Sequence, residues 1–166
     1  MGTRTLILLR HAKSDYPDGV ADHDRPLAKR GIREAALAGD WIRAHLPAVD
    51  AVLCSTATRT RQTLARTGIT APVTYVDRLY DATAGIAIDV INGAPEDANT
   101  VLLIGHEPVM SSLALSLASL DTSDRDAAGQ IAMKYPTSAI AVLDTDRHWS
   151  QLELRGARLV EFHIPR

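Results

Sequence analysis

Short apolar runs alternate along this chain with longer stretches in which polar and apolar residues mix. The apolar runs have the length and composition of buried strands, and they lie at 5–9, 51–54, 73–76, 100–104, 139–143 and 158–164. Apolar residues recur at helical spacing in 29–46, 57–66, 84–91 and 108–120. In the first of these segments Ile32, Ala35, Gly39 and Ile42 share one face, and Pro47 stops the helix.

This order of strands and helices predicts an α/β fold, a three-layer sandwich in which helices cover both faces of a mostly parallel sheet. The last two predicted strands have no helical pattern between them, so we expect a mixed sheet. Residues 13–26 and 121–137 are expected to be polar connections, of the length that often shapes a substrate site. The whole chain, 1–166, is expected to form a single domain.

Composition narrows the class of protein further. The chain is 46% hydrophobic and 23% charged, with a net charge of −2, so no global field draws it to nucleic acid or to a membrane. The single cysteine, Cys54, excludes an internal disulfide and is expected to be a buried, unreactive thiol. No apolar run approaches the length of a membrane span or resembles a secretory signal, so we expect a cytoplasmic location.

Charged and polar residues stand directly after several of the predicted strands. Arg10 and His11 follow the first strand, Arg59 opens the helix after the second, Asp81 lies after the third, and His106 follows the fourth. Ligands of open α/β sheets gather at the carboxyl ends of the strands. The sequence therefore predicts that two histidines, two arginines and a carboxylate meet at one edge of the sheet.

This set of side chains suits the transfer of a phosphoryl group. Arginines supply forked donors that match phosphate oxygens, and a helix that begins after His106 offers free N–H groups to an anion. One imidazole can attack phosphorus, and the other can donate a hydrogen bond to the oxygens as they gain charge. A carboxylic acid can protonate the leaving atom. No metal or other cofactor is expected, because the arginines neutralise the anion.

Four stretches carry a family resemblance. The stretch "LLRHAKS" resembles the Arg-His-Gly/Ala signature of the histidine phosphatase superfamily, the phosphoglycerate mutase-like proteins. "CSTATRTRQT" and "LLIGHEP" are similar to its second and third blocks, and "RHAKS" and "DHDRPLAKRG" resemble the SixA-type phosphohistidine phosphatases. The resemblance implies a phosphoglycerate mutase-like fold. It also implies that His11 is the nucleophile that becomes phosphohistidine, and that Arg10, Arg59 and His106 hold the phosphoryl group.

Asp81 is the main departure from the family pattern. It stands in "LYD", where many members carry a glutamate, and its side chain is one methylene shorter. Two interpretations stay open, a proton donor and a plain loop carboxylate. A weak acid at this place favours a phosphohistidine substrate over a sugar phosphate, because a phosphoramidate leaves as a nitrogen base that is easily protonated whereas an alkoxide needs a supplied proton.

Other polar residues near these motifs are weaker candidates. Ser14 and Arg25 are candidates for binding the substrate, whereas Lys13 and Arg61 are expected to be solvated side chains. The triplet 22–24, Asp-His-Asp, could suggest a metal, but three adjacent residues rarely converge on one ion, so no metal site is predicted.

The function that these observations favour is a phosphatase that works through a covalent phosphohistidine on His11, with a phosphorylated histidine of a protein as its substrate. Two alternatives stay open: a phosphatase of a small phosphate monoester, such as a sugar phosphate, and a non-catalytic phosphate-binding module. The expected partner is accordingly a phosphorylated protein or a small phosphorylated molecule. Neither nucleic acid nor a membrane is expected as a partner, and the oligomeric state cannot be predicted from these patterns.

Overall fold

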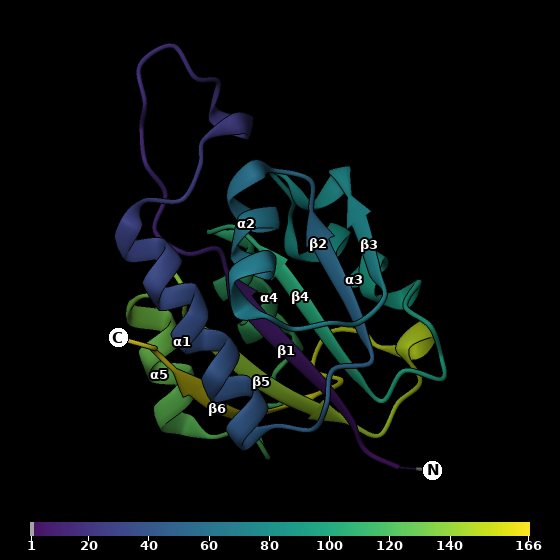
Figure 1. The fold of residues 1–166 in the computed structure, drawn as a ribbon. Helices are drawn as coiled ribbons and strands as arrows, with labels where there is room; N and C mark the ends of the chain where they lie inside the picture. Colours follow the sequence, from purple (N-terminus) through teal and green to yellow (C-terminus); the bar gives the residue numbers. More distant parts are fainter. Residues whose placement is uncertain (1) are drawn as a thin grey trace.

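A six-stranded sheet runs through the middle of the computed structural model, which describes residues 2–166 (Figure 1). Its strands are β1 (Arg4–Arg10), β2 (Ala51–Ser55), β3 (Val73–Val76), β4 (Thr100–Gly105), β5 (Ile140–Thr145) and β6 (Arg158–His163). The strand order is β3-β2-β4-β1-β5-β6. β1, β2, β3 and β4 pair in parallel, whereas β5 is antiparallel to both of its neighbours. The predicted mixed, mostly parallel sheet is confirmed.

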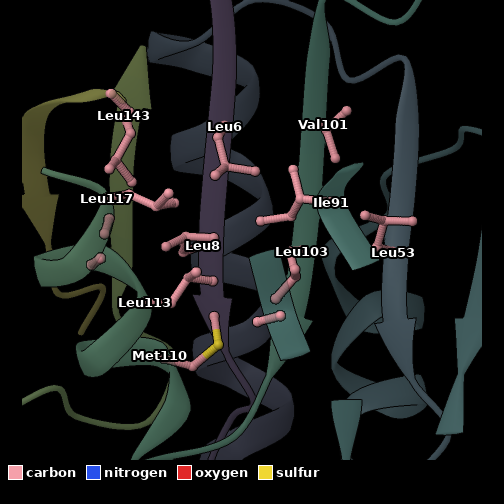
Figure 2. Close-up of a cluster of buried hydrophobic side chains, with 14 of the residues drawn as sticks. Leu6, Leu8, Leu53, Ile91, Val101, Leu103, Met110, Leu113, Leu117 and Leu143 are labelled. Carbon is pink, nitrogen blue, oxygen red and sulfur yellow. The ribbon is translucent and has the colours of Figure 1, made fainter. Parts of the chain in front are cut away.

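Helices cover both faces of this sheet. α1 (Lys29–His45) and α2 (Thr58–Thr67) lie on one face, and α3 (Ala84–Asn92), α4 (Val109–Leu117) and α5 (Arg125–Met133) lie on the other. Side chains alternate along β1, so Leu6 and Leu8 belong to the core beneath α3, α4 and α5, while Ile7 and Leu9 belong to the core beneath α1 and α2. Figure 2 shows the first of these cores, with Leu8 beside Leu113 of α4. The strands are thus buried on both faces.

The prediction of a polar connection over 121–137 was wrong, because this segment contains α5. The carboxylate of Asp124 caps this helix by accepting a hydrogen bond from the Ala127 N–H at 2.9 Å. Ala127 and Ile131 are the buried residues of α5, so the apolar stripe is too short to produce a clear helical period. Between β5 and β6 the chain forms a single 3₁₀ turn, Trp149–Gln151, in place of a helix.

Two glycines of α1 allow backbone to approach the helix closely. An ideal Cβ on Gly31 would lie 2.0 Å from the carbonyl oxygen of Lys13, and one on Gly39 would lie 2.1 Å from the carbonyl oxygen of Thr67. Either side chain would force the neighbouring backbone away. These contacts hold α1 against the segment that follows β1 and against the end of α2, the two elements that carry the arginine and histidine motifs.

The sequence also predicts a buried cysteine and no segment long enough to span a membrane. The expected burial of Cys54 is confirmed: it lies buried in β2, and burial raises the pKa of its thiol to about 12. Within residues 2–166, every helix is too short or too polar to cross a lipid bilayer.

Candidate active site

The carboxyl ends of the parallel strands bring Arg10, His11, Arg59 and His106 to the walls of one cavity of about 230 Å³, here called the His11 cavity. β1 delivers Arg10 and His11, β4 delivers His106, and the first turn of α2 delivers Arg59. The His11 N–H donates to the carbonyl oxygen of Gly105 at 3.0 Å, which ties the ends of β1 and β4 together. The His11 and His106 rings lie with their centroids 5.3 Å apart.

The tautomer of His11 is fixed by the backbone carbonyl of the next residue, Ala12. Its Nδ1 lies 2.7 Å from the carbonyl oxygen of Ala12, and because a carbonyl only accepts, Nδ1 must carry the proton. Burial lowers the pKa of His11 to about 3, with smaller contributions from His106 and the arginines, so the ring is neutral at physiological pH. Nε2 therefore keeps its lone pair, which is the form in which an imidazole acts as a nucleophile.

Three nitrogens of the surrounding residues are buried without a hydrogen-bond partner among the described residues: Nε of Arg10, Nε of Arg59 and Nδ1 of His106. Nε2 of His106 lies 2.8 Å from the Ser55 hydroxyl, which can donate to it and so leave the ring proton on Nδ1. Burial and the nearby Arg59 lower the pKa of His106 to about 4, which keeps this ring neutral as well. Buried donors normally have partners, so this cluster is suited to an anion that accepts from all three.

Asp22 contacts Arg59 from the polar segment 13–26, which extends away from the sheet (Figure 1). Arg59 donates from Nη1 to the Asp22 carbonyl oxygen at 2.7 Å and from Nη2 to its carboxylate at 3.2 Å. The Tyr80 hydroxyl donates to the same carboxylate. This hydrogen bond, with the positive charge of Arg59, lowers the pKa of Asp22 to about 2. Asp22 is therefore an ionised acceptor that positions Arg59 and binds its two outer nitrogens.

The candidate substrate-binding residues Ser14 and Arg25 also line the His11 cavity, together with Lys13. Arg25 donates to the Ser14 hydroxyl and to the Asp22 carboxylate, each at 3.0 Å. Arg61 lies outside this site: it donates to the Thr56 carbonyl oxygen at 2.8 Å and is exposed, as expected. The four cations of the cavity, from Arg10, Lys13, Arg25 and Arg59, make it attractive to an anion.

Asp81 lies in a different cavity from His11. It lines a neighbouring space of about 370 Å³, here called the Asp81 cavity, together with Asp22, Tyr80 and Ala82. The two cavities share Arg59, His106 and Glu107 as lining residues. The structure thus places the candidate proton donor beside Arg59 and His106 but not among the residues that line the His11 cavity.

The triplet 22–24 does not converge on a common point. The Asp22 carboxylate faces Arg59 and Tyr80, whereas Nε2 of His23 lies 3.1 Å from the Thr56 hydroxyl. In the part of the chain that the structure describes, no three histidine, cysteine, aspartate or glutamate side chains form a group that could hold a metal ion.

Several residues of this site were not found as site residues from the sequence: Asp22, Ser55, Tyr80 and Glu107. Glu107 follows His106 directly, and Ser55 lies at the start of the second motif. Their positions next to predicted site residues therefore indicate that they lie near the site. The one role that the sequence suggests for Asp22 is that of a metal ligand in the triplet 22–24. Nothing in the sequence pattern indicates that Tyr80 meets Asp22, because the two residues belong to loops far apart in the chain.

The two buried histidines give a testable dependence of stability on pH. A histidine in an unfolded chain has a pKa of about 6.5, whereas the folded values are about 3 for His11 and about 4 for His106. Between these values and 6.5 the unfolded chain binds more protons, so the free energy of unfolding falls as the pH is lowered through this window. Each histidine contributes a slope of up to about 1.4 kcal/mol per pH unit.

We therefore expect His11→Gln to lose less stability than the wild type between pH 7 and pH 4.5, as measured by urea unfolding at a series of pH values. His45→Gln, at the exposed end of α1, is the matched control. An unchanged pH slope in His11→Gln would contradict the burial of a neutral His11.

The fold and the site together define an α/β protein with a cavity that is lined by arginines and built around a neutral histidine at the carboxyl ends of parallel strands. A protein-family model described as the histidine phosphatase superfamily (branch 1) matches residues 6–90. The chain belongs to this superfamily. The predicted family and the predicted phosphoglycerate mutase-like fold are both confirmed.

Similar proteins span the whole chain. An uncharacterized protein of Mycobacterium tuberculosis is 60% identical over 158 residues, which cover 95% of this chain and 100% of the relative. The structure of the proposed phosphohistidine phosphatase SixA of Nakamurella multipartitia has a TM-score of 0.92 and 43% identity, and covers 99% of this chain and 98% of that one. That of Agrobacterium tumefaciens has a TM-score of 0.79 and 29% identity, and covers 98% and 99%.

Proposed function

We propose that this protein is a phosphatase that transfers a phosphoryl group to Nε2 of His11 and then to water, and that its substrate is phosphohistidine on a protein. The observation that carries the proposal is the state of His11. Its Nδ1 is occupied by the Ala12 carbonyl, so its lone pair belongs to Nε2, in a cavity lined by Arg10, Arg59 and His106. Membership of the histidine phosphatase superfamily supports the same chemistry.

In the first step Nε2 of His11 attacks phosphorus, and the bond from phosphorus to the leaving nitrogen breaks. The guanidinium groups of Arg10 and Arg59 reduce the repulsion between the anionic oxygens and the incoming lone pair. Nδ1 of His106 donates to an oxygen whose charge grows in the transition state. Because both rings are neutral and buried before the substrate enters, little reorganisation accompanies the reaction.

The position of the carboxylates supports a phosphoramidate substrate. Asp81 lines the neighbouring cavity, and Asp22 is ionised by its bonds to Tyr80 and Arg59. Glu107 does line the His11 cavity, but both of its oxygens accept hydrogen bonds from Ser111, so it is oriented as an acceptor and not as an acid toward a leaving group. An alkoxide needs such an acid, whereas the imidazole of phosphohistidine departs as a neutral base when its other nitrogen carries a proton. The similarity to proteins described as SixA phosphohistidine phosphatases is consistent with this substrate class.

A substrate panel tests the proposal. We expect the wild type to hydrolyse a protein carrying phosphohistidine with a kcat/KM at least about 100-fold above that for sugar phosphates and p-nitrophenyl phosphate, because only the esters need a supplied proton. Asp81→Asn should change the phosphohistidine reaction by less than about two-fold. Asp18→Asn, an exposed aspartate of the polar segment, is the matched control.

Each other outcome selects a different function. A preference of orders of magnitude for one small ester, slowed in Asp81→Asn, would overturn the substrate class and make Asp81 the acid. Phosphate binding without turnover of any substrate would identify a non-catalytic binding module.

A further inference from the structure

We propose that Glu107 is the general base of the second step, the carboxylate that takes a proton from the water that attacks phosphorylated His11. This inference rests on the proposed function, since it assigns a residue to the hydrolysis of the same covalent intermediate. Neither the family motifs nor the sequence patterns considered above give Glu107 a role.

The position of Glu107 is the first support. Among the described residues that line the His11 cavity, Glu107 carries the one carboxylate, and it also lines the Asp81 cavity. It is half-buried and follows His106 at the end of β4. Its negative charge acts on Arg10, where it opposes the lowering of the arginine's pKa by burial. Glu107 therefore stands where the Asp81 cavity meets the residues around His11.

The hydrogen bonds of Glu107 favour a base over an acid. Its Oε1 accepts from the Ser111 N–H at 2.7 Å, and its Oε2 accepts from the Ser111 hydroxyl at 2.8 Å. Both bonds hold the carboxylate in one orientation at the start of α4. A carboxylate has about four lone-pair directions, so two bonds leave each oxygen able to accept from water. Arg10, which also lines the His11 cavity, attracts this carboxylate.

The reaction balances with these groups alone. Water attacks phosphorus while Glu107 takes one of its protons, and the bond between phosphorus and Nε2 of His11 breaks with its electron pair on Nε2. Because Nδ1 already carries a proton donated to Ala12, His11 leaves as a neutral imidazole. The products are monohydrogen phosphate, the free enzyme and a protonated Glu107, which returns its proton to solvent.

A purely structural role for Glu107 is the competing explanation, since its bonds to Ser111 also cap α4. Glu107→Gln separates the two, because a glutamine keeps an oxygen for the Ser111 N–H and an amide for the Ser111 hydroxyl but cannot accept a proton. Ser111→Ala does the reverse: it removes the hydroxyl bond of the cap and keeps the carboxylate. Glu161→Gln, an exposed glutamate of β6, is the matched control.

Rapid mixing of each variant with phosphoramidate, a small substrate with a P–N bond, followed by an alkaline quench, measures the phosphohistidine on the enzyme. We expect Glu107→Gln to form phosphoenzyme at a rate within a few-fold of the wild type and to hydrolyse it about 100-fold more slowly. Phosphohistidine on His11 should then approach one per enzyme molecule. It should not accumulate in Ser111→Ala or Glu161→Gln. Glu107→Ala, which lacks both carboxylate and cap, gives the same comparison if the glutamine variant does not fold.

The possible outcomes distinguish this inference from the proposed function. If wild-type enzyme forms no phosphohistidine on His11, the proposed function is overturned, and this inference with it. If the wild type forms it and Glu107→Gln hydrolyses it equally fast, only the role of Glu107 is overturned. Accumulation in Ser111→Ala equal to that in Glu107→Gln would assign the effect to the helix cap, and would also overturn the inference.

Discussion

His11→Ala is expected to abolish covalent phosphorylation of the enzyme and to lower kcat by about four orders of magnitude or more. The reason is that alanine has no lone pair with which to attack phosphorus, and no described neighbour is placed to replace it. His106 cannot take over, because its Nε2 faces the Ser55 hydroxyl at 2.8 Å. Labelling with radioactive substrate, an alkaline quench and peptide mapping measure the covalent step, and single-turnover kinetics measure the rate.

The same variant should still bind inorganic phosphate within about ten-fold of the wild-type affinity, because Arg10, Arg59 and His106 remain in the His11 cavity. Loss of kcat with retained binding is the pattern of a missing nucleophile, whereas loss of both indicates a collapsed site. His45→Ala, which removes an exposed histidine of α1, should behave as the wild type. Stoichiometric label on a residue other than His11, or full activity in His11→Ala, would refute the proposed mechanism.

The meeting of His11, Arg59 and His106 could be predicted because it depends on sheet geometry. Each residue follows a short apolar run, and parallel strands necessarily place their carboxyl ends at the same edge. Register then fixes the details: Arg10 pairs with Gly105 in the β1–β4 ladder, so His11 and His106 emerge side by side. Periodicity and order along the chain were sufficient for this part of the site.

The contacts of Asp22 could not be predicted, because the segment 13–26 has no hydrophobic period and its conformation depends on tertiary contacts. Asp22 contacts Arg59 of α2 and Tyr80 of a distant loop, and the close approach of Lys13 to Gly31 joins the same segment to α1. The helix α5 was missed for a related reason, since Ala127 and Ile131 form too short a stripe. The position of Asp81 beside, and not within, the His11 cavity is likewise set by a loop, in which Asp81 itself has a φ of 61°.

Arg59→Lys is expected to lower kcat/KM by about two to three orders of magnitude, although it keeps the positive charge. Arg59 lines the His11 cavity, and its Nη1 and Nη2 bind Asp22, while its Nε is buried without a hydrogen-bond partner among the described residues. A lysine ammonium is a single point and cannot hold Asp22 and a phosphoryl oxygen in these two directions. We expect the loss mainly in kcat, because the donor to the transition state is removed.

Arg61→Lys is the matched control, two residues further along α2. Arg61 lies outside both cavities, with its guanidinium 4.2 Å from the centroid of the Tyr75 ring and its Nε bonded to Thr56. Its substitution should change kcat/KM by less than about two-fold. Equal effects of the two substitutions would mean that α2 acts through its overall positive charge. A large effect at Arg59 alone would show that the planar geometry of its guanidinium is required. Asp22 binds the two outer nitrogens of this group, so the guanidinium is already oriented before a substrate binds.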